Sequence, residues 1–266
     1  MPSSMLVVDR VVKRFVHSGQ GAALDGVSLE LAAGEFATVV GSNGAGKTTL
    51  LHVIAGGLLP DEGRVVVDGH EVTAWPQHRR AGWIGMVFQD PAAGTAGSLT
   101  VEENMVLALT AGRRRTLAPA VRPARREWVV ESLRRLGMGL EQRLHVAVRH
   151  LSGGQRQALA LLMAAARQPR VLLLDEHTAS LDPQAAEAVL ELTRQLVRDL
   201  GLTTLMVTHN LKHALTMGDR TVIMHRGRVV LDLRGERRRR MDVGDLAEAF
   251  RHACHEVLAD DQMILA

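Results

Sequence analysis

Short apolar runs alternate with turn signals through the first third of the chain. Pairs such as Asp25-Gly26 and Asp68-Gly69 favour tight reversals, and the runs between them are short and of β type. One longer apolar segment follows a glycine-rich stretch and stops at Gly56-Gly57, which is typical of a helix end. The pattern predicts strands at residues 6–12, 27–31, 35–40, 64–67 and 83–88, and a helix at 47–55.

Helical periodicity replaces this alternation in the middle of the chain. Thr100 and Glu103 have the spacing of a capping box at the start of a helix. Apolar positions at helical spacing indicate a second helix further on. We predict helices at 100–110 and 125–136, loops at 91–97 and 111–123, and a helical subdomain over 90–150 between two core segments, 1–89 and 151–233.

Strands and helices alternate again after residue 150. Asp182 and Pro183 begin a helix in the favoured manner, with Asp as the cap and Pro at the first helical position. This alternation predicts an α/β fold with a mixed or parallel central sheet, and the early strands predict an N-terminal antiparallel β-subdomain. The predicted helices are 156–167, 182–200, 210–217 and 243–253, the predicted strands 171–174, 202–208, 221–224 and 228–231, and the charged tail is 234–266.

Composition and charge narrow the class of protein. The 266 residues are 46% hydrophobic, enough for a sizeable core, and the single Cys254 excludes an internal disulfide framework and fits a reducing cytosol. No apolar run approaches the ~18 residues needed to span a bilayer, and no secretory signal is visible, so we expect a soluble cytoplasmic chain. The net charge is +3, and arginine runs such as 113–115 and 237–240 could meet nucleic acid or anionic lipid. A solvated surface explains them better, because Tyr is absent and other aromatic residues for base stacking are few.

A phosphate loop, Gly-x-x-x-x-Gly-Lys-Thr, lies between a predicted strand and a predicted helix. Glycines let backbone N–H groups turn inward around phosphate oxygens, and the helix N-terminus adds a partial positive charge. Lys47 can reach the β- and γ-phosphates, and the Thr48 hydroxyl can ligate Mg²⁺. We therefore expect a P-loop NTPase core that binds ATP through Gly41, Ser42, Asn43, Gly44, Ala45, Gly46, Lys47, Thr48 and Thr49.

Asp175 and Glu176 end a continuous apolar run, as expected of a central strand buried on both faces. Ligands bind at the carboxyl ends of such strands. Asp175 suits Mg²⁺, directly or through water, and Glu176 suits polarisation of the attacking water as a general base. Two adjacent acids would otherwise repel, so a bound cation is a physical reason for both.

Gln89 and His209 follow two other predicted strands. The amide of Gln89, where the core gives way to the helical insert, could contact Mg²⁺ or the water. A neutral imidazole at His209 could bond the γ-phosphate or orient the water and Glu176. Each is weak evidence alone, since such residues are commonly plain surface positions, and their order around the acidic strand favours function.

Leu151-Ser152-Gly153-Gly154-Gln155 is a second glycine-rich turn that opens a helix. One chain therefore carries two phosphate-binding surfaces. Both cannot easily serve the same nucleotide from one side. The pairing predicts a dimer with ATP sandwiched between two copies.

These motifs, in this order, resemble the ATP-binding subunit of an ABC transporter over nearly all of residues 6–233. The resemblance implies that Ser152, Gly153, Gly154 and Gln155 act on ATP held by the other copy, that Asp182 runs along the dimer interface, and that Phe15 stacks on adenine. His177 stands where the family usually has proline, and Thr178-Ala179-Ser180 varies the usual segment. Residues 175–183 and 202–211 are similar to ATPases of tryptophan/tyrosine uptake systems and, more distantly, of branched-chain amino-acid importers.

The resemblance implies an ATP-hydrolysing subunit that energises uptake of a small solute such as an amino acid. Its expected cofactors are ATP and Mg²⁺. Its expected partners are separate transmembrane permease subunits, a head-to-tail second copy and an extracytoplasmic substrate-binding protein, with the chain at the cytoplasmic face of the membrane. The alternative is a non-transport ABC-type ATPase acting on nucleic acid or ribosomes, against which stand the single cassette and the short separation of the two phosphate motifs. A metabolic P-loop kinase explains neither the signature turn nor His209.

Overall fold

The computed structural model describes residues 4–15, 21–110 and 123–264, with side chains described through Cys254. The chain divides into two compact units. The first unit combines Met1–Gln77 with Thr203–Ala266, and the second unit is His78–Leu202. The division predicted from the sequence places a helical subdomain at 90–150, and this division stays a prediction.

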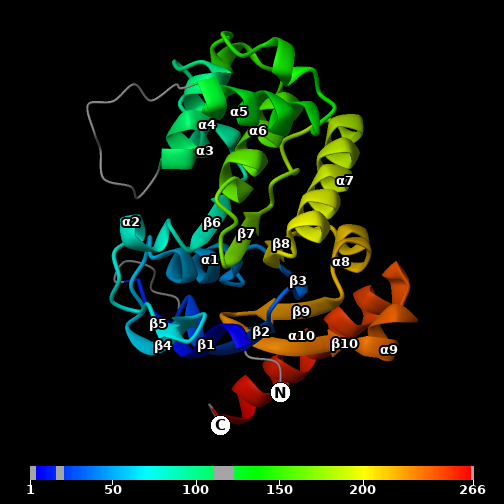
Figure 1. Cartoon of the computed structure of the whole chain (residues 1–266). Helices are drawn as coiled ribbons and strands as arrows, with labels where there is room; N and C mark the ends of the chain where they lie inside the picture. The colour runs from blue at the N-terminus through cyan, green and yellow to red at the C-terminus, as the bar shows by residue number, and fades with distance from the viewer. Residues whose placement is uncertain (1–3, 16–20, 111–122, 265–266) are drawn as a thin grey trace. The chain divides into compact units, whose positions relative to one another are not determined.

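An antiparallel sheet in the first unit is drawn in blue and cyan in Figure 1. Along β2, residues 27–31 alternate between buried and exposed positions, so one face of the sheet is covered and the other meets water. This is the predicted N-terminal β-subdomain. Its strands are β1 (Ser4–Lys13), β2 (Leu24–Ala32), β4 (Glu62–Val67) and β5 (His70–Glu71), in the order β2-β1-β4-β5.

Strand β3 (Phe36–Gly41) is the central strand of the first unit. It pairs in parallel with β8 (Thr203–Val207) on one side and with β9 (Arg220–His225) on the other. A strand was predicted at 35–40, and the residues of β3 from Phe36 to Val40 are all buried, as is usual for a strand with parallel neighbours on both sides. The predicted strands at 221–224 and 228–231 form a hairpin, because β10 (Arg228–Arg234) returns antiparallel to β9.

Helices accompany these strands in the part of the first unit that the structure describes. Two of them differ from the sequence prediction: α10 extends further than the predicted 243–253, and α9 lies in a stretch that was read only as charged tail. Helix α9 packs against β9 and β10, a contact between segments that composition does not reveal. The helices are α1 (Lys47–Ala55), α8 (Leu211–Met217), α9 (Gly235–Arg239) and α10 (Val243–Ile264).

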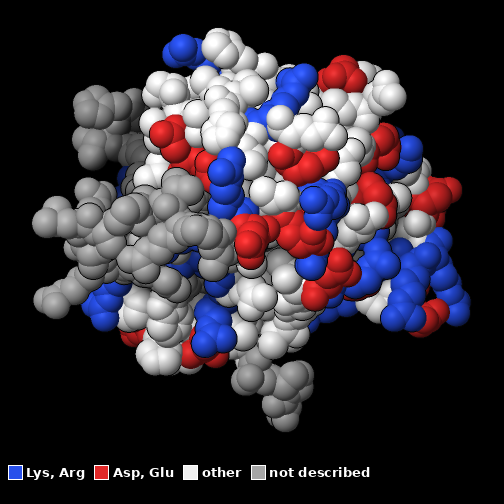
Figure 2. Space-filling model, turned by 45° about the horizontal axis from the view of Figure 1, so that its top comes forward, with Lys and Arg blue, Asp and Glu red and all other residues white. Residues whose placement is uncertain are grey.

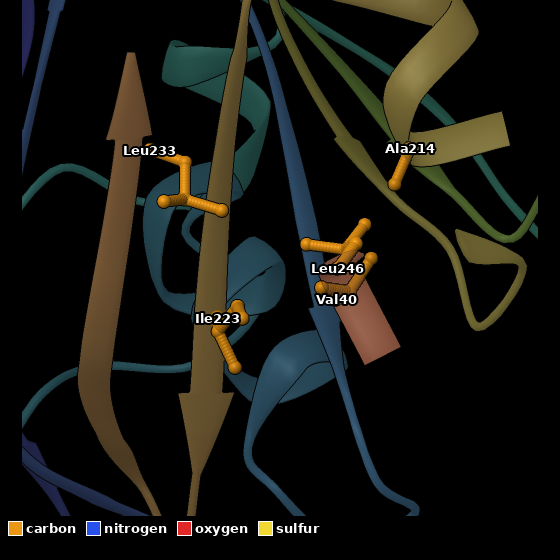
Figure 3. Packing of buried hydrophobic residues seen from close by; sticks show 5 residues of the cluster. All are labelled: Val40, Ala214, Ile223, Leu233 and Leu246. Carbon is orange, nitrogen blue, oxygen red and sulfur yellow. The ribbon is translucent and has the colours of Figure 1, made fainter. Parts of the chain in front are cut away.

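The C-terminal helix α10 contributes to the hydrophobic core of the first unit. Leu246 is fully buried in one cluster with Val40, the residue before the phosphate loop, and with Ala214 of α8 (Figure 3). Ile223 and Leu233 complete the buried cluster. The segment after β10 is therefore part of the fold that supports β3, and not an appended tail.

The second unit joins a parallel strand pair to several helices. The register of β6 (Ile84–Val87) with β7 (Val171–Asp175) runs from Ile84 beside Val171 to Val87 beside Leu174. Residues 91–97 were predicted as a loop, but a short helix begins there because Asp90 accepts a hydrogen bond from the Ala92 amide. The helices are α3 (Pro91–Gly94), α4 (Val101–Thr110), α5 (Pro123–Arg134), α6 (Gly153–Ala165) and α7 (Pro183–Leu200), with 3₁₀ turns at Leu140–Gln142 and Val148–His150; α2 (Gln77–Arg80) spans the boundary of the units along the chain.

The predicted capping box begins α4 as expected. The Thr100 amide donates to Glu103 Oε2 at 2.8 Å, and the Glu103 amide donates to Thr100 Oγ1 at 3.2 Å. The bond from the Thr100 amide, and a second one from the Thr100 hydroxyl, hold the pKa of the Glu103 carboxyl below its usual value. The stretch 111–122, predicted to be exposed, lies outside the described residues. In the described part of the chain, no helix has the length and hydrophobicity of a membrane-spanning segment.

Candidate nucleotide-binding site

The phosphate loop leaves the carboxyl end of β3 and runs into α1. Gly44 and Gly46 have φ values of +80° and +95°, in the left-handed region that favours glycine. A Cβ on Gly46 would lie 2.3 Å from the carbonyl oxygen of Ala23. Position 46 therefore excludes any side chain for two reasons, its dihedral angle and the adjacent backbone.

No side chain caps the N-terminus of α1. The positive end of the helix dipole thus faces the loop, where the fold provides a site for an anion. The Lys47 side chain is buried, and its Nζ donates to the carbonyl oxygens of Gly41 and Ser42 at 2.9 and 3.1 Å. Its charge is thereby held inside the loop. Ser42, Asn43, Gly44 and Thr48 are exposed around it, and Thr49 is half-buried.

The turn between β9 and β10 supports the phosphate loop from behind. The Gly227 amide donates to the Ala45 carbonyl at 3.1 Å, and the Asp25 amide donates to the Gly227 carbonyl at 2.8 Å. A Cβ on Gly41 would lie 2.4 Å from the Met224 carbonyl oxygen. Sequence reasoning missed this contact, because residues 25, 45 and 227 are distant along the chain and the only local signal was a glycine in a hairpin turn.

His209 lies at the same sheet edge as the phosphate loop. In the parallel register Val39 is opposite Val207, and the Thr208 amide donates to the Val39 carbonyl at 3.1 Å. Beyond these positions, one strand continues to Gly41 and the other to His209, at the same edge of the sheet. His209 is exposed, and Asn210 caps α8 directly after it by accepting from the Lys212 and His213 amides.

Phe15 follows β1 and is 43% exposed. The Lys13 ammonium lies 6.0 Å from the centroid of its ring. An exposed aromatic face is available for stacking, and the role of Phe15 at adenine stays a prediction.

Gln89 and Glu176 lie at one edge of the strand pair in the second unit. Val87 pairs with Leu174, and Gln89 and Glu176 each lie two residues after these paired positions. Ser180 Oγ donates to the Gln89 carbonyl at 3.4 Å, which ties the turn after β7 to the segment after β6. The fully buried Gln157 of α6 donates from Nε2 to the Phe88 carbonyl at 3.2 Å and fixes the same segment.

The acidic pair has an unusual backbone. Asp175 is the buried last residue of β7, and Glu176 is half-buried with φ of +44°, a value that costs free energy for a residue with a side chain. The turn that follows is closed by a 2.9 Å bond from the Ala179 amide to the Glu176 carbonyl. Glu176 thus follows the carboxyl end of a buried strand, the place where ligands bind in such sheets.

His177 has a structural role in this turn. It is fully buried, and its Nε2 lies 3.0 Å from Thr193 Oγ1 on α7. The Thr193 hydroxyl already donates to the Val189 carbonyl at 2.7 Å, so its oxygen accepts from His177 Nε2–H. His177 therefore anchors the turn on α7 at the position where proline is usual in the family.

Ser152 is the N-cap of α6, in a capping box that the sequence analysis did not predict. The Gln155 amide donates to Ser152 Oγ at 3.2 Å, and the Ser152 amide donates to Gln155 Oε1 at 3.3 Å. Gln155 Nε2 also donates to the Met138 carbonyl at 3.1 Å. The Gln155 side chain thus holds the turn in shape.

The signature turn packs directly on the Asp182 turn. Cβ atoms built on Gly153 and Gly154 would lie 3.2 Å from Leu181 Cδ2 and 3.1 Å from Ala185 Cβ. Asp182 caps α7 by accepting from the Ala185 amide at 3.0 Å, as predicted. The two turns at the starts of α6 and α7 therefore form one surface.

A scan for family models matches this chain at residues 24–179 to the model described as ABC transporter. The chain belongs to the ABC transporter family. It is 40% identical over 251 residues to the tyrosine transport ATP-binding protein of Clostridioides difficile (strain R20291), across 94% of this chain and 100% of that protein. It is 36% identical over 232 residues to the methionine import ATP-binding protein MetN of Caulobacter vibrioides, across 85% of this chain and 66% of that protein.

A solved structure supports the same conclusion. The ATP-binding cassette MJ0796, in a dimeric post-hydrolysis state bound to ADP and Pi, matches with a TM-score of 0.75 and 29% identity, across 86% of this chain and 98% of that one. The chain is thus an ATP-binding subunit of an ABC transporter, an ATPase coupled to transport with the α/β cassette fold. The predictions of fold, family and enzymatic class from the motifs are confirmed.

Proposed function

We propose that this chain energises uptake of an amino acid by hydrolysing ATP between two head-to-tail copies of itself. The observation that carries the proposal is the contrast between an uncapped helix N-terminus at the phosphate loop and a second glycine-rich turn in the same chain whose surface is already formed. The phosphates of one bound ATP are expected to contact a phosphate loop on one side and a second glycine-rich turn on the other. Two copies bring the required two surfaces to each ATP.

The residue roles in this proposal follow the chemistry of each group. Lys47 and the loop amides hold the β- and γ-phosphates. Glu176 polarises the attacking water, and His209 bonds the γ-phosphate and orients that water. Phe15 stacks on adenine. Ser152, Gly153, Gly154, Gln155 and Asp182 form the surface that closes on the ATP of the other copy.

Mg²⁺ fits the donor set of the proposed site. Thr48, Gln89 and Asp175 offer hydroxyl, amide and carboxylate oxygens, the ligand type that Mg²⁺ prefers. Among the described residues there is no cluster of three or more His, Cys, Asp or Glu that would hold a metal by itself. This agrees with an ion that is bound together with the nucleotide phosphates. When bound, Mg²⁺ supplies neutralisation of phosphate charge.

The proposed partners are transmembrane permease subunits, and an extracytoplasmic substrate-binding protein in addition, with this chain at the cytoplasmic face of the membrane. The similarity to a tyrosine transport ATP-binding protein favours an aromatic amino acid as cargo. On the coloured part of the face in Figure 2, Lys and Arg are interspersed with Asp and Glu, so that part of the face does not favour binding of nucleic acid.

Replacing Glu176 by Gln tests the catalytic half of the proposal. The change keeps the shape of the side chain and removes the base, so ATP hydrolysis by the purified chain is expected to fall about 10³-fold while ATP binding stays. Light scattering of the variant with ATP and Mg²⁺ is expected to report a dimer that wild-type protein loses on turnover. Full ATPase activity in the variant would contradict the role of Glu176.

Uptake assays test the cargo. The permease genes co-expressed with this chain are expected to support accumulation of radiolabelled tyrosine or tryptophan in cells, and Lys47→Ala is expected to abolish it. Methionine and leucine serve as comparison substrates. Accumulation of neither aromatic amino acid would contradict the proposed cargo and leave the ATPase assignment untouched.

A further inference from the structure

One arginine of the C-terminal run is buried among exposed neighbours. Arg237, Arg239 and Arg240 are exposed, whereas Arg238 of α9 is only 6% exposed. Burial of a guanidinium is costly unless its donors are satisfied. It lowers the pKa of Arg238, and the negative charge of Asp219 opposes that shift. The fold therefore accepts this cost for a specific contact.

The contact is made with the C-terminal turn of α8. Arg238 Nη2 donates to the carbonyl oxygens of Ala214 and Leu215 at 2.8 and 3.0 Å, and Nε donates to Thr221 Oγ1 at 3.0 Å. The last four carbonyl groups of a helix accept no hydrogen bond from an amide of the same helix. The helix dipole favours a cation beside them. Arg238 is thus a cap on α8 supplied by a residue far along the chain.

The same carbonyl connects α8 to the strand that carries the phosphate loop. Thr38 of β3 donates from Oγ1 to the Ala214 carbonyl at 3.0 Å, and its oxygen lies 3.1 Å from Thr221 Oγ1. Thr38 and Thr221 are both fully buried. Leu246 of α10 and Ala214 of α8 belong to the same hydrophobic cluster (Figure 3). The end of α8 is therefore fixed to β3, β9 and the C-terminal segment at once.

The other end of α8 begins at Leu211, two residues after His209. Asn210 caps that end through two amide bonds, at 2.9 and 3.2 Å. The helix is only seven residues long, so a shift or tilt at its C-terminal end is carried to its N-terminal end. The position of the His209 imidazole relative to the phosphate loop then depends on where Arg238 holds α8.

We propose that Arg238 is a positioning residue for His209, through which the C-terminal helices set the rate of ATP hydrolysis. The proposal rests on the role of His209 in the proposed function. Arg238 contacts α8 and not the nucleotide, so its loss affects the hydrolytic step and leaves the phosphate loop itself intact.

Arg238→Met and its matched control Arg239→Met separate this role from a general effect of charge. Arg239 is exposed and pairs with Glu236 on the surface of the same helix. In the full-length chain we expect Arg238→Met to lower kcat roughly tenfold with KM for ATP nearly unchanged, because small misplacements of a catalytic group are costly. Arg239→Met is expected to match wild type. Equal kinetics for the two variants, or a rise in KM without loss of kcat, would overturn the proposal.

A double-mutant cycle with His209→Ala decides whether Arg238 acts through His209. We expect the double variant to be no slower than His209→Ala alone, because the group that Arg238 positions is already gone. Losses that multiply would show an independent, structural role and overturn the inference. If His209→Ala keeps full activity, the role of His209 in the proposed function has failed, which is a separate result from multiplied losses.

Two milder variants carry the cycle if Arg238→Met does not fold. Arg238→Lys keeps a cation at the end of α8 and is expected to recover part of the lost kcat. Thr221→Val removes one partner of the guanidinium and is expected to lower kcat less than Arg238→Met. Thermal unfolding of each variant checks the fold, and failure of lysine to recover any activity in a folded variant would count against the positioning role.

Discussion

The phosphate loop and the signature turn are both glycine-rich starts of helices, yet their glycines serve different physical needs. Gly44 and Gly46 have positive φ values and allow a backbone path that other residues resist. Gly153 and Gly154 have no positive φ, and their missing side chains instead make room for Leu181 and Ala185. Glycine content alone does not say which of the two needs applies.

The two turns also differ in how their helix N-termini are satisfied. No side chain caps α1, while Ser152 and Gln155 cap α6 reciprocally. The first turn is therefore prepared for an anion, and the second is a finished surface of the protein with an exposed Ser152. This difference supports a division of labour in which the phosphate loop binds ATP and the signature turn acts only when a second copy closes on it.

Ser152→Arg is expected to have the largest effect among the substitutions that test this difference between the turns. A bulky cation at the dimer surface blocks closure, so hydrolysis should fall by about 10²-fold or more, while ATP binding at Lys47 stays nearly intact. Equilibrium binding of a fluorescent ATP analogue and steady-state phosphate release measure the two effects. Lys47→Ala is the control, with binding itself lost. Loss of binding in Ser152→Arg as severe as in Lys47→Ala would show that the two turns do not divide the work.

Gly46→Ala is expected to have the next largest effect. The new Cβ meets the Ala23 carbonyl at a φ value that alanine resists, so destabilisation of roughly 3 kcal/mol and weakened ATP binding are expected. Urea unfolding measures the stability. Gly44→Ala is the matched control, because its φ is also positive but no atom lies within 4 Å of the new Cβ, and a cost of about 1 kcal/mol is expected.

Gly154→Ala is expected to be milder than Gly46→Ala. The Ala185 methyl group can yield by a few tenths of an ångström, and alanine is a better helix former by about 1 kcal/mol, which offsets the crowding. Net destabilisation below about 1 kcal/mol is expected in the same urea experiment. Gly154→Val enlarges the packing conflict and gives back part of the gain in helix propensity, so it should cost more. If Gly154→Ala were as harmful as Gly46→Ala, the glycines of the two turns would not differ in the way described.

Acid should affect an ion pair in the unit of the phosphate loop. Burial opposes ionisation of Asp232, but two 2.8 Å bonds from the buried Arg220, and bonds from Arg234, hold the pKa of its carboxyl below the ordinary 3.8. A lowered folded-state pKa contributes stability that is present above the unfolded value and lost as pH falls through the folded one.

Asp232→Asn measures that contribution. It is expected to cost on the order of 1 kcal/mol at neutral pH, and the difference from wild type should shrink below about pH 4. Urea unfolding at several pH values gives both numbers. A difference that stays constant down to about pH 3 would show that the carboxylate charge is not what stabilises the pair.

Local patterns were sufficient to predict most elements and the phosphate loop. The apolar runs at β3 and β7, the capping box at Thr100 and the Asp182-Pro183 helix start all depend on near neighbours in the chain, and the structure has each of them. The predicted loop at 91–97 was wrong in part, since Asp90 begins a short helix there. That signal, an Asp followed by Pro, was present in the sequence.

Contacts between distant residues could not be predicted in the same way. Arg238 was read with its neighbours as a solvated run, because only the packing of Ala214, Leu215 and Thr221 around it distinguishes it from Arg239. The capping role of Gln155 had a local signal in the sequence, because the Ser-x-x-Gln spacing is typical of a capping box.

The sequence by itself determined that this chain binds a nucleotide and has two glycine-rich turns, because glycine, lysine and acid spacing act over a few residues. Only the tertiary structure decided what each glycine is for. A positive φ and a missing Cβ look identical in sequence, and only the structure shows that Gly44 and Gly46 have positive φ values while Gly153 and Gly154 do not. The tertiary structure also decided that the C-terminal segment belongs to the core, because Leu246 packs with Val40 and Ala214, and Arg238 contacts the end of α8.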